Sequence, residues 1–352
     1  MPHGMRKSRI VCVGFLCLCF AVQVESITNR LGYLLTDDAS SVTPLTFSQY
    51  QTTADVWLHH TLPLTPIDKV TAFGYAPPVY RSLTAMVYYA LARTPWPNQA
   101  HDLLTILLWL AAYMALYALA SQWLTSGGAM ACVAVAITLN LSGWEGTGTE
   151  GIIQTILMAV GLLALVRRRW IWLFSSFVLM TMNREDAALL IAVAGLLWLT
   201  DRKDRHLLWS TLGLLAIFVL YQILAVSYIG HRPRYCPLVR WHENLDGIMY
   251  VVRTLNIHTP VVAFFTTFIP LLVAAWWPQK GKPVALKAAL TVATLYIAAS
   301  FVIGMLRESH RNWQLMPLLV PLALWTLFPG LRLQQDLAET CPAPVAPPDV
   351  AP

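Results

Sequence analysis

The sequence predicts an all-α membrane protein with about ten transmembrane helices. Of its 352 residues, 57% are hydrophobic and only 12% are charged, and the mean hydropathy is +0.56. A soluble chain of this length needs roughly a quarter of its residues charged to cover its exterior. The 24 Lys and Arg and 18 Asp and Glu residues instead stand in short clusters between long apolar runs. This pattern excludes a soluble dehydrogenase, a nucleic-acid-binding domain and a disulfide scaffold.

Ten uncharged stretches are candidates for crossing a hydrocarbon core of roughly 30 Å, which takes about 20 helical residues. The fifth and sixth are short. A single helix over 170–200 would bury Asn183-Arg184-Glu185-Asp186 at mid-membrane, whereas two passes keep Arg167–Arg169 and Arg202–Arg205 on one side. The ten are Ile10–Val24, Leu103–Leu124, Ala129–Gly143, Gly151–Val166, Trp170–Met182, Ala187–Thr200, Leu207–Ile229, Pro260–Trp277, Ala288–Leu306 and Trp313–Leu331.

The charges favour a cytoplasmic N-terminus and a multi-pass protein of the cell (inner) membrane. In this orientation the inner cations are dense in short loops, and only five of the 18 acids lie inside, which leaves 13 outside. The first span can also be a cleaved signal peptide, without changing the sidedness of the rest. The predicted parts are an N-terminal span or signal anchor (1–26), an extracytoplasmic loop (27–102), a first bundle part (103–229), a second extracytoplasmic loop (230–259), a second bundle part (260–331) and a disordered cytoplasmic tail (332–352).

The first outer loop carries two adjacent acids, Asp37 and Asp38. A carboxylate at a membrane surface can take the proton from an attacking hydroxyl, and its neighbour can position the acceptor or a divalent cation. In the alternative interpretation the loop is solvated and Asp38 caps a helix. Later in this loop, two prolines precede apolar residues at helical spacing, which predicts an amphipathic helix on the outer leaflet. Those apolar residues are Val79, Leu83, Met86, Val87, Ala90 and Leu91.

The second outer loop is rich in arginine. Arg232, Arg234 and Arg240 are candidates for holding a lipid phosphate, because a guanidinium binds phosphate oxygens in a bidentate way. Contact with ordinary phospholipid headgroups is the alternative. A second amphipathic helix is predicted in the same loop from one apolar face, formed by Leu245, Ile248, Met249, Val252 and Leu255.

Shorter outer turns place charge at the ends of predicted spans. Glu150 and Arg184 belong to two of these turns, and ionisable residues there tend to face a polar cavity because lipid would be unfavourable. Internal pairing, for example of Arg184 with Glu150 or Glu145, is the alternative. The histidines lack the pairing with carboxylates that a metal-binding helix would show. No phosphate-binding Gly-Lys-Ser/Thr loop occurs in the sequence, so ATP-driven transport by this chain alone is not expected.

Taken in order, five short motifs resemble those of the GT-C superfamily of integral-membrane glycosyltransferases, nearest to the bacterial arabinofuranosyl- and mannosyltransferase-like members. Glu185 departs from the pattern, since many members have proline there. The motifs are Asp37-Asp38, Tyr75-Ala76-Pro77-Pro78, Gly148-Thr149-Glu150, Asn183-Arg184-Glu185-Asp186, and Arg307 with Arg311-Asn312-Trp313 and Pro317.

The resemblance implies an inverting transferase that moves a sugar from a polyprenyl-phosphate donor to a hydroxyl of a glycan, lipid or protein acceptor on the extracytoplasmic face. It implies that Asp37 or Asp38 acts as general base. Arg232, Arg234 or Arg311 would stabilise the leaving phosphate. The remaining motif residues, Glu150, Arg184 and Tyr75, would contact sugar or acceptor.

No cofactor is required by this chemistry, although a divalent cation is compatible with it. The expected partners are the lipid-linked donor, the acceptor and membrane lipids, and no nucleic acid. Two other classes of function remain open from the sequence. One is a transporter or flippase of a lipid-linked substrate, which predicts charges deep within spans and inverted repeats. The other is a non-catalytic membrane subunit.

Overall fold

The chain is helical throughout the part that the structure describes. The computed structural model describes residues 53–59, 81–142, 149–229, 241–254, 260–277, 281–303 and 314–333. Within these residues no strand forms, and the single extended pairing is an antiparallel bridge between Leu124 and Arg332. The first predicted span, the Asp37-Asp38 pair and the tail from residue 334 lie outside the described residues, while Arg332 and Leu333, predicted as the start of a disordered tail, hydrogen-bond to the bundle. The predicted all-α class is therefore confirmed for the described part.

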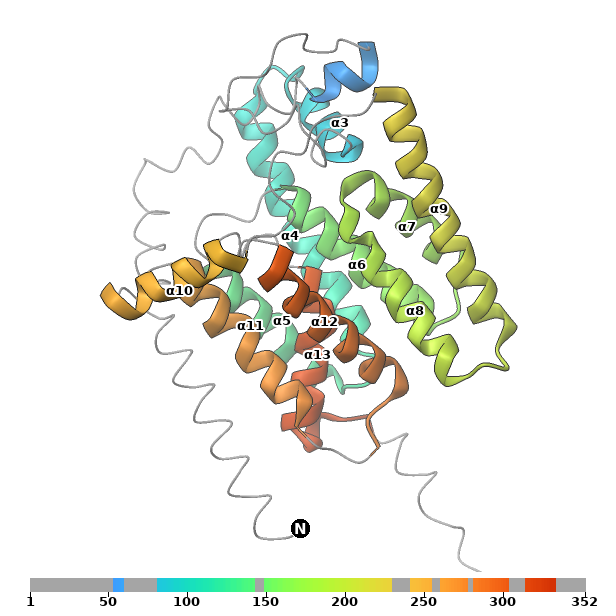
Figure 1. Ribbon diagram of the computed structural model, residues 1–352, viewed down its shortest axis with the longest axis vertical. Coiled ribbons are helices and arrows are strands. Elements are labelled where there is room, and N and C mark those ends of the chain that lie inside the picture. Colours follow the sequence, from blue (N-terminus) through green and yellow to red (C-terminus); the bar gives the residue numbers. More distant parts are fainter. Residues whose placement is uncertain are drawn as a thin grey trace, which may run out of the picture.

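A helix lies within or across each of the nine predicted spans from the second to the tenth. Figure 1 shows these helices as one bundle, with α9 along one side and α10 projecting from the other. The helices that coincide with predicted spans are α4 (Pro97–Ala120), α5 (Ser126–Ser142), α6 (Thr149–Val166), α7 (Trp170–Asn183), α8 (Ala188–Thr200), α9 (Arg205–Ile229), α11 (Pro260–Trp276), α12 (Val284–Ile303) and α13 (Met316–Leu327).

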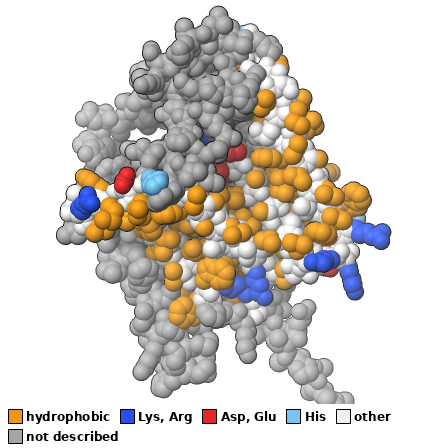
Figure 2. Space-filling view, viewed as in Figure 1, with side chains coloured by type: hydrophobic (Ala, Val, Ile, Leu, Met, Phe, Trp, Pro, Cys, Tyr) orange, Lys and Arg blue, Asp and Glu red, His pale blue; other side chains and the backbone are white. Residues whose placement is uncertain are grey.

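Four of these helices are long and apolar enough to cross a membrane. They contain the stretches Gln99–Ala120, Thr149–Val166, Arg205–Ile229 and Val284–Val302. Large apolar side chains cover their outward faces; on α9, Trp209 and Leu220 are 67% and 57% exposed. Figure 2 shows such side chains over most of the described surface on this face. A soluble protein rarely exposes apolar patches of this extent, so these surfaces suit lipid contact.

Helix α13 occupies the centre of the bundle. All twelve of its residues are buried, and it packs against α5, α11 and α12. The last predicted span, Trp313–Leu331, therefore corresponds to a shorter helix that is enclosed by protein on every side. Pro317 lies in its first turn, where the missing N–H has no helical partner to lose, and Pro321 follows inside the helix.

The chain turns back between α7 and α8, as the two-pass interpretation of residues 170–200 predicts. Helix α7 ends at Asn183, a single 3-10 turn (η3, Glu185–Ala187) follows, and α8 begins at Ala188. At the far ends of these helices, Arg168 Nη2 lies 2.7 Å from Asp204 Oδ2. The two basic clusters therefore lie together at one end of the bundle.

Other contacts bring further turns to the same end. Arg167 Nε donates to Gln122 Oε1 at 3.0 Å, which joins the α6–α7 turn to the end of α4. The backbone N–H of Leu333 donates to Trp123 O at 3.0 Å, and that of Thr125 donates to Leu331 O at 2.8 Å. The α4–α5, α6–α7 and α8–α9 turns and the segment after α13 thus share one end, which we call the basic end.

The two amphipathic segments predicted in the outer loops are helical. They form α3 (Ser82–Leu91) and α10 (Trp241–Thr254). Helix α3, however, packs on the bundle through Ser82, Thr84, Ala85 and Tyr88, and not through the apolar residues that predicted it. Polar groups on α7 and α6 lie opposite this face, and they attract its hydroxyl groups more than its apolar side.

The close approach of α5 to the segment after α13 depends on Gly128. A Cβ atom there would lie 3.0 Å from Leu124 Cβ and 3.1 Å from Leu331 O, and neither atom can move without the backbone. We expect Gly128→Ala to lower the free energy of unfolding by about 1–3 kcal/mol through overpacking. Thermal unfolding of the purified protein in detergent measures the change.

The adjacent glycine provides the matched control. A Cβ atom at Gly127 would meet nothing within 4 Å. Since alanine favours a helix over glycine, Gly127→Ala should leave stability unchanged or raise it by up to about 1 kcal/mol. Equal losses for both variants would contradict this packing of the α5 terminus.

Candidate functional site

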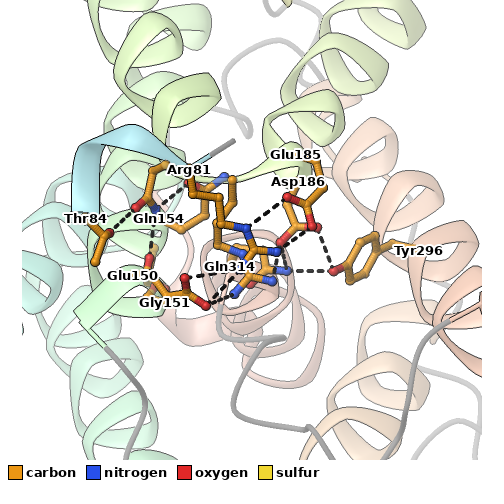
Figure 3. Close-up of polar contacts among 12 residues, drawn as sticks. Arg81, Thr84, Glu150, Gly151, Gln154, Glu185, Asp186, Tyr296 and Gln314 are labelled. Atoms are coloured by element: carbon orange, nitrogen blue, oxygen red, sulfur yellow. Dashed lines mark hydrogen bonds and ion pairs between the residues drawn. The ribbon is translucent and has the colours of Figure 1, made fainter. Parts of the chain in front are cut away.

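A network of charged and polar side chains lies at the end of the bundle opposite the basic end. It joins the first turn of α6, the α7–α8 junction, the middle of α12 and the residue preceding α3. Figure 3 shows Arg81, Glu150, Glu185, Asp186, Tyr296 and Gln314 directed toward one another. We call these residues, with Asn183, Arg184 and Gln154, the charged cluster.

Arg81 links α3 to two carboxylates of the bundle. Its Nη2 and Nε atoms donate to Glu185 at 2.6 and 3.2 Å. Its Nη1 atom donates to the two oxygens of Glu150 at 3.1 and 3.2 Å. Because the Arg81 side chain is only 9% exposed, these pairs are shielded from solvent on the arginine side. One guanidinium therefore holds together α3, α6 and η3.

Arg184 lies in the centre of the same network. Its Nη2 atom is 2.7 Å from Asp186 Oδ2, and its Nη1 atom is 3.8 Å from Glu150 Oε1. The residue is 3% exposed. The internal pairing of Arg184 with Glu150, expected from the sequence as one alternative, is thus present in the structure. It does not by itself exclude a ligand, because each guanidinium has five N–H donors.

Asp186 connects the α7–α8 junction to α12 and α13. Tyr296 donates its hydroxyl to Asp186 Oδ1 at 3.0 Å. Gln314 donates from Nε2 to Asp186 Oδ2 at 3.0 Å and lies 2.8 Å from the Tyr296 hydroxyl. The carboxylate therefore has partners on both oxygens, and its position is fixed by three helical segments distant in sequence.

Asn183 fixes the end of α7 against its neighbours. Its Nδ2 atom donates to Glu150 O at 2.8 Å and to Gln154 Oε1 at 3.0 Å. Its Oδ1 atom accepts from Thr84 of α3 at 2.6 Å. Asparagine is a poor helix former, and here its side-chain amide makes contacts that a continuing apolar helix could not make.

The cluster holds more acid than base among the described residues. Two arginines face three carboxylates, those of Glu150, Glu185 and Asp186. Burial acts to raise the pKa of Glu185, but Arg81 and Arg184 outweigh it and lower that pKa. Burial raises the pKa of Asp186 more than Arg184 lowers it. The adjacent carboxylates thus differ, and Asp186 is the one that takes up a proton more readily.

Three polar atoms in this region have no hydrogen-bond partner among the described residues. They are Arg184 Nε, Gln154 Nε2 and Gln314 Oε1. The three residues are 3%, 0% and 0% exposed, respectively. Buried polar groups in proteins are almost always satisfied by protein or by a bound molecule. The described residues therefore leave two donors and one acceptor of the cluster without a hydrogen-bond partner.

The cluster lies below the ends of the longest helices. Helix α7 has 14 residues and α8 has 13, so each rises only about 20 Å, short of a hydrocarbon core of roughly 30 Å. Helix α9 has 25 residues, and Figure 1 shows it reaching beyond the α7–α8 junction. Helix α6, which also starts from the basic end, has 18 residues and rises about 27 Å, and its first turn carries Glu150, so the cluster lies at the opposite end of the bundle.

Of the residues selected from the sequence, the structure brings Glu150 and Arg184 together. The others lie outside the described residues, so their positions stay predictions. These are Asp37, Asp38, Tyr75, Arg232, Arg234, Arg240 and Arg311.

Several members of the cluster were not selected from the sequence. Asp186 and Glu185 stood within a motif that was noticed, but no role was assigned to them. Tyr296 lies within an apolar run of the sequence, and Gln314 lies at the edge of another. Arg81 is the member that the sequence could have indicated, because it is a lone cation directly before a predicted amphipathic helix. Long-range pairing of this kind leaves no spacing pattern in the chain.

No known protein family, curated protein or solved structure matches this chain. Within the described residues, no group of three His, Cys, Asp or Glu side chains is placed to hold a metal ion.

Arg81 should determine whether α3 stays attached to the bundle. In Arg81→Leu, Glu150 and Glu185 lose their shared cation and repel each other, and because their side chains are only 15% and 40% exposed, water screens this repulsion in part. We expect amide hydrogen exchange in residues 82–91 to accelerate by about tenfold or more. Exchange read by mass spectrometry on the purified protein measures this.

Arg93→Leu is the matched control, since it removes an arginine just beyond the other end of α3. The Arg93 guanidinium stacks on the Tyr89 ring and donates to its hydroxyl, all within one turn. Exchange in α3 should stay close to wild type. If the two variants behaved alike, Arg81 would not be the residue that attaches α3.

Proposed function

We propose that this protein is an inverting glycosyltransferase that moves a sugar from a polyprenyl-phosphate donor to an acceptor hydroxyl. In this proposal the chain has about ten spans and a cytoplasmic N-terminus in the cell membrane, and the reaction takes place on the extracytoplasmic face. The charged cluster then lies in the outer half of the bilayer, at a depth where a lipid-linked sugar can reach it.

The observation that carries the proposal is the meeting of Glu150 and Arg184 in one enclosed network. Both residues belong to motifs that resemble those of membrane glycosyltransferases, and they are separated by two helices in sequence. Their neighbours are carboxylates, amides and a guanidinium, which are the side chains that bind hydroxyl groups through paired hydrogen bonds. The unpartnered atoms of Arg184, Gln154 and Gln314 add further places for such bonds.

The charge of the cluster favours sugar or acceptor hydroxyls over phosphate as its ligand. With three carboxylates against two arginines, a lipid phosphate here would meet net repulsion. We therefore assign the phosphate to the predicted outer-loop arginines Arg232, Arg234, Arg240 and Arg311.

The proposed reaction is a single displacement. Asp37 or Asp38 takes the proton of the acceptor hydroxyl while that oxygen attacks the anomeric carbon. The bond between this carbon and the phosphate oxygen breaks, its electrons stay on the leaving lipid phosphate, and the anomeric configuration inverts. Arginine donors stabilise the charge that develops on the phosphate. Glu150 and Arg184 hold the sugar or acceptor in line, so their contribution is orientation.

A transporter of a lipid-linked substrate is the competing class. Such a protein is expected to carry its charges near the bilayer midplane. Here Glu150 and Arg184 lie at helix ends, in the second position of α6 and directly after α7. The members of the cluster that lie further inside a span are Gln154 and Tyr296, which are polar side chains and not ionised acids or bases. This placement favours the transferase.

The proposal is tested by reconstituting the full chain in liposomes with undecaprenyl-phosphate-linked mannose, glucose or arabinofuranose and a membrane extract as the source of acceptor. Wild type should release undecaprenyl phosphate from one of these donors. Asp37→Asn/Asp38→Asn should reduce the release by about a hundredfold or more, because the general base is lost. Glu150→Gln and Arg184→Gln should each reduce it by about tenfold or more.

Asp201→Asn is the control, because it neutralises an exposed carboxylate at the basic end. Its release rate should equal that of wild type. Full release by the Asp37→Asn/Asp38→Asn variant would exclude these carboxylates as the base. Movement of the labelled lipid across the bilayer without cleavage of its sugar would replace the proposal with the transporter.

A further inference from the structure

The basic end carries a second concentration of charge, unlike the charged cluster in both sign and exposure. Residues 167–169 and 201–205 contain six cations and two acids. Five of the cations are arginine, and all six side chains are exposed. Arg169, Arg202, Lys203 and Arg205 have no acidic partner among the described residues. This surface is therefore strongly positive and open.

Two contacts fasten these turns into one surface. Arg168 and Asp204 form the ion pair described above, in which the Asp204 side chain is 6% exposed. The ring of Trp170 stacks on that of His206, with centroids 6.4 Å apart and planes 20° from parallel. One partner of each contact comes from the α6–α7 turn and the other from the α8–α9 turn. The spacing of the surrounding cations is thereby fixed.

In the α6–α7 turn, Arg168 occupies a backbone position where glycine is usual. Arg168 has a φ of 55°, in the left-handed region. The N–H groups of Arg168 and Arg169 donate to Leu165 O and Ala164 O at 3.2 and 2.8 Å, which closes the C-terminus of α6 in a Schellman motif. A side chain in this conformation is unfavourable, and here it supplies the pair with Asp204.

Apolar and aromatic side chains lie directly beside the cations on the membrane side. Ile171 and Trp172, in the first turn of α7, are 82% and 65% exposed, and Trp209, in the second turn of α9, is 67% exposed. Exposed tryptophans next to basic residues are typical of the boundary between headgroups and acyl chains. A free soluble anion would leave these apolar groups uncovered. A phospholipid would cover them with its acyl chains while its phosphate meets the arginines.

We infer that the α6–α7 and α8–α9 turns form a binding site for an anionic phospholipid, whose headgroup lies between Arg169 and Arg202 and whose chains lie along Trp172 and Trp209. Both lipids offer a phosphate to the guanidinium groups, but the choline cation of phosphatidylcholine is repelled by the surrounding basic residues, so the site prefers a headgroup with a net negative charge. This site is at the opposite end of the molecule from the charged cluster. The lipid-binding inference does not depend on the proposed transferase activity.

The experiment uses the full chain in nanodiscs of phosphatidylcholine with a minor fraction of phosphatidylglycerol, released and weighed by native mass spectrometry. Wild type should retain phosphatidylglycerol in preference to phosphatidylcholine. Arg169→Gln/Arg202→Gln should weaken that preference by about thirtyfold, because each basic residue near an anionic surface contributes about a fivefold increase in affinity for the anionic lipid. Lys203→Gln/Arg205→Gln, which spares both turn-to-turn contacts, should weaken it in the same direction.

Arg93→Gln/Arg253→Gln removes the same number of charges elsewhere and should keep the wild-type preference. Thermal unfolding in pure phosphatidylcholine checks that all variants are folded. The inference would be overturned if both basic-end variants kept the wild-type preference for phosphatidylglycerol. It would also be overturned if the control lost this preference equally, because the net charge of the protein would then determine lipid binding. Displacement of the lipid by glycerol phosphate would show that the site takes a free phosphate and would overturn the assignment to lipid.

Discussion

Ionised side chains cannot be left unpaired among apolar helices, and this constraint acts most strongly on Asn183-Arg184-Glu185-Asp186. A continuous helix over 170–200 would carry these residues into the bilayer interior with the cost of desolvating three charges. The chain instead ends α7, makes one 3-10 turn and starts α8. The break allows Arg184 to meet Asp186 and Glu150, and it allows Asn183 to bond Gln154. The shortness of α7 and α8 follows from the same constraint.

Other elements take their positions from this junction. Glu185 and Glu150 together offer more negative charge than Arg184 can balance, and α3 supplies Arg81 to them. This explains why α3 turns its hydroxyl-bearing face to the bundle and leaves Leu83 and Met86 partly exposed. Helix α12 contributes Tyr296 to Asp186, and the turn directly before α13 contributes Gln314, which aligns the central helix with the junction. A polar network thus specifies how otherwise interchangeable apolar helices pack.

The sequence was sufficient for what depends on local composition. The apolar runs predicted nine of the described helices within a few residues, and the basic clusters predicted the turn between α7 and α8. The burial of α13 could not be predicted in this way, because a lipid-facing run and a protein-enclosed run have the same composition. The partners of Arg81 could not be predicted either. They are 69 and 104 residues away, and only the packing of α3 on α6 and α7 brings them within bonding distance.

The two ends of the bundle differ in the sign and the exposure of their charged side chains, and this difference determines what each end can bind. At the basic end the cations are exposed and exceed the acids among the described residues, and the lipid-binding inference gives them anionic headgroups as partners. In the charged cluster the acids exceed the arginines among the described residues, and the raised pKa of Asp186 and the hydrogen bonds from Tyr296 and Gln314 offset part of this negative charge. In the proposed function, the hydroxyl groups of a lipid-borne sugar bind to the unpartnered atoms of this cluster, while its phosphate lies outside the cluster.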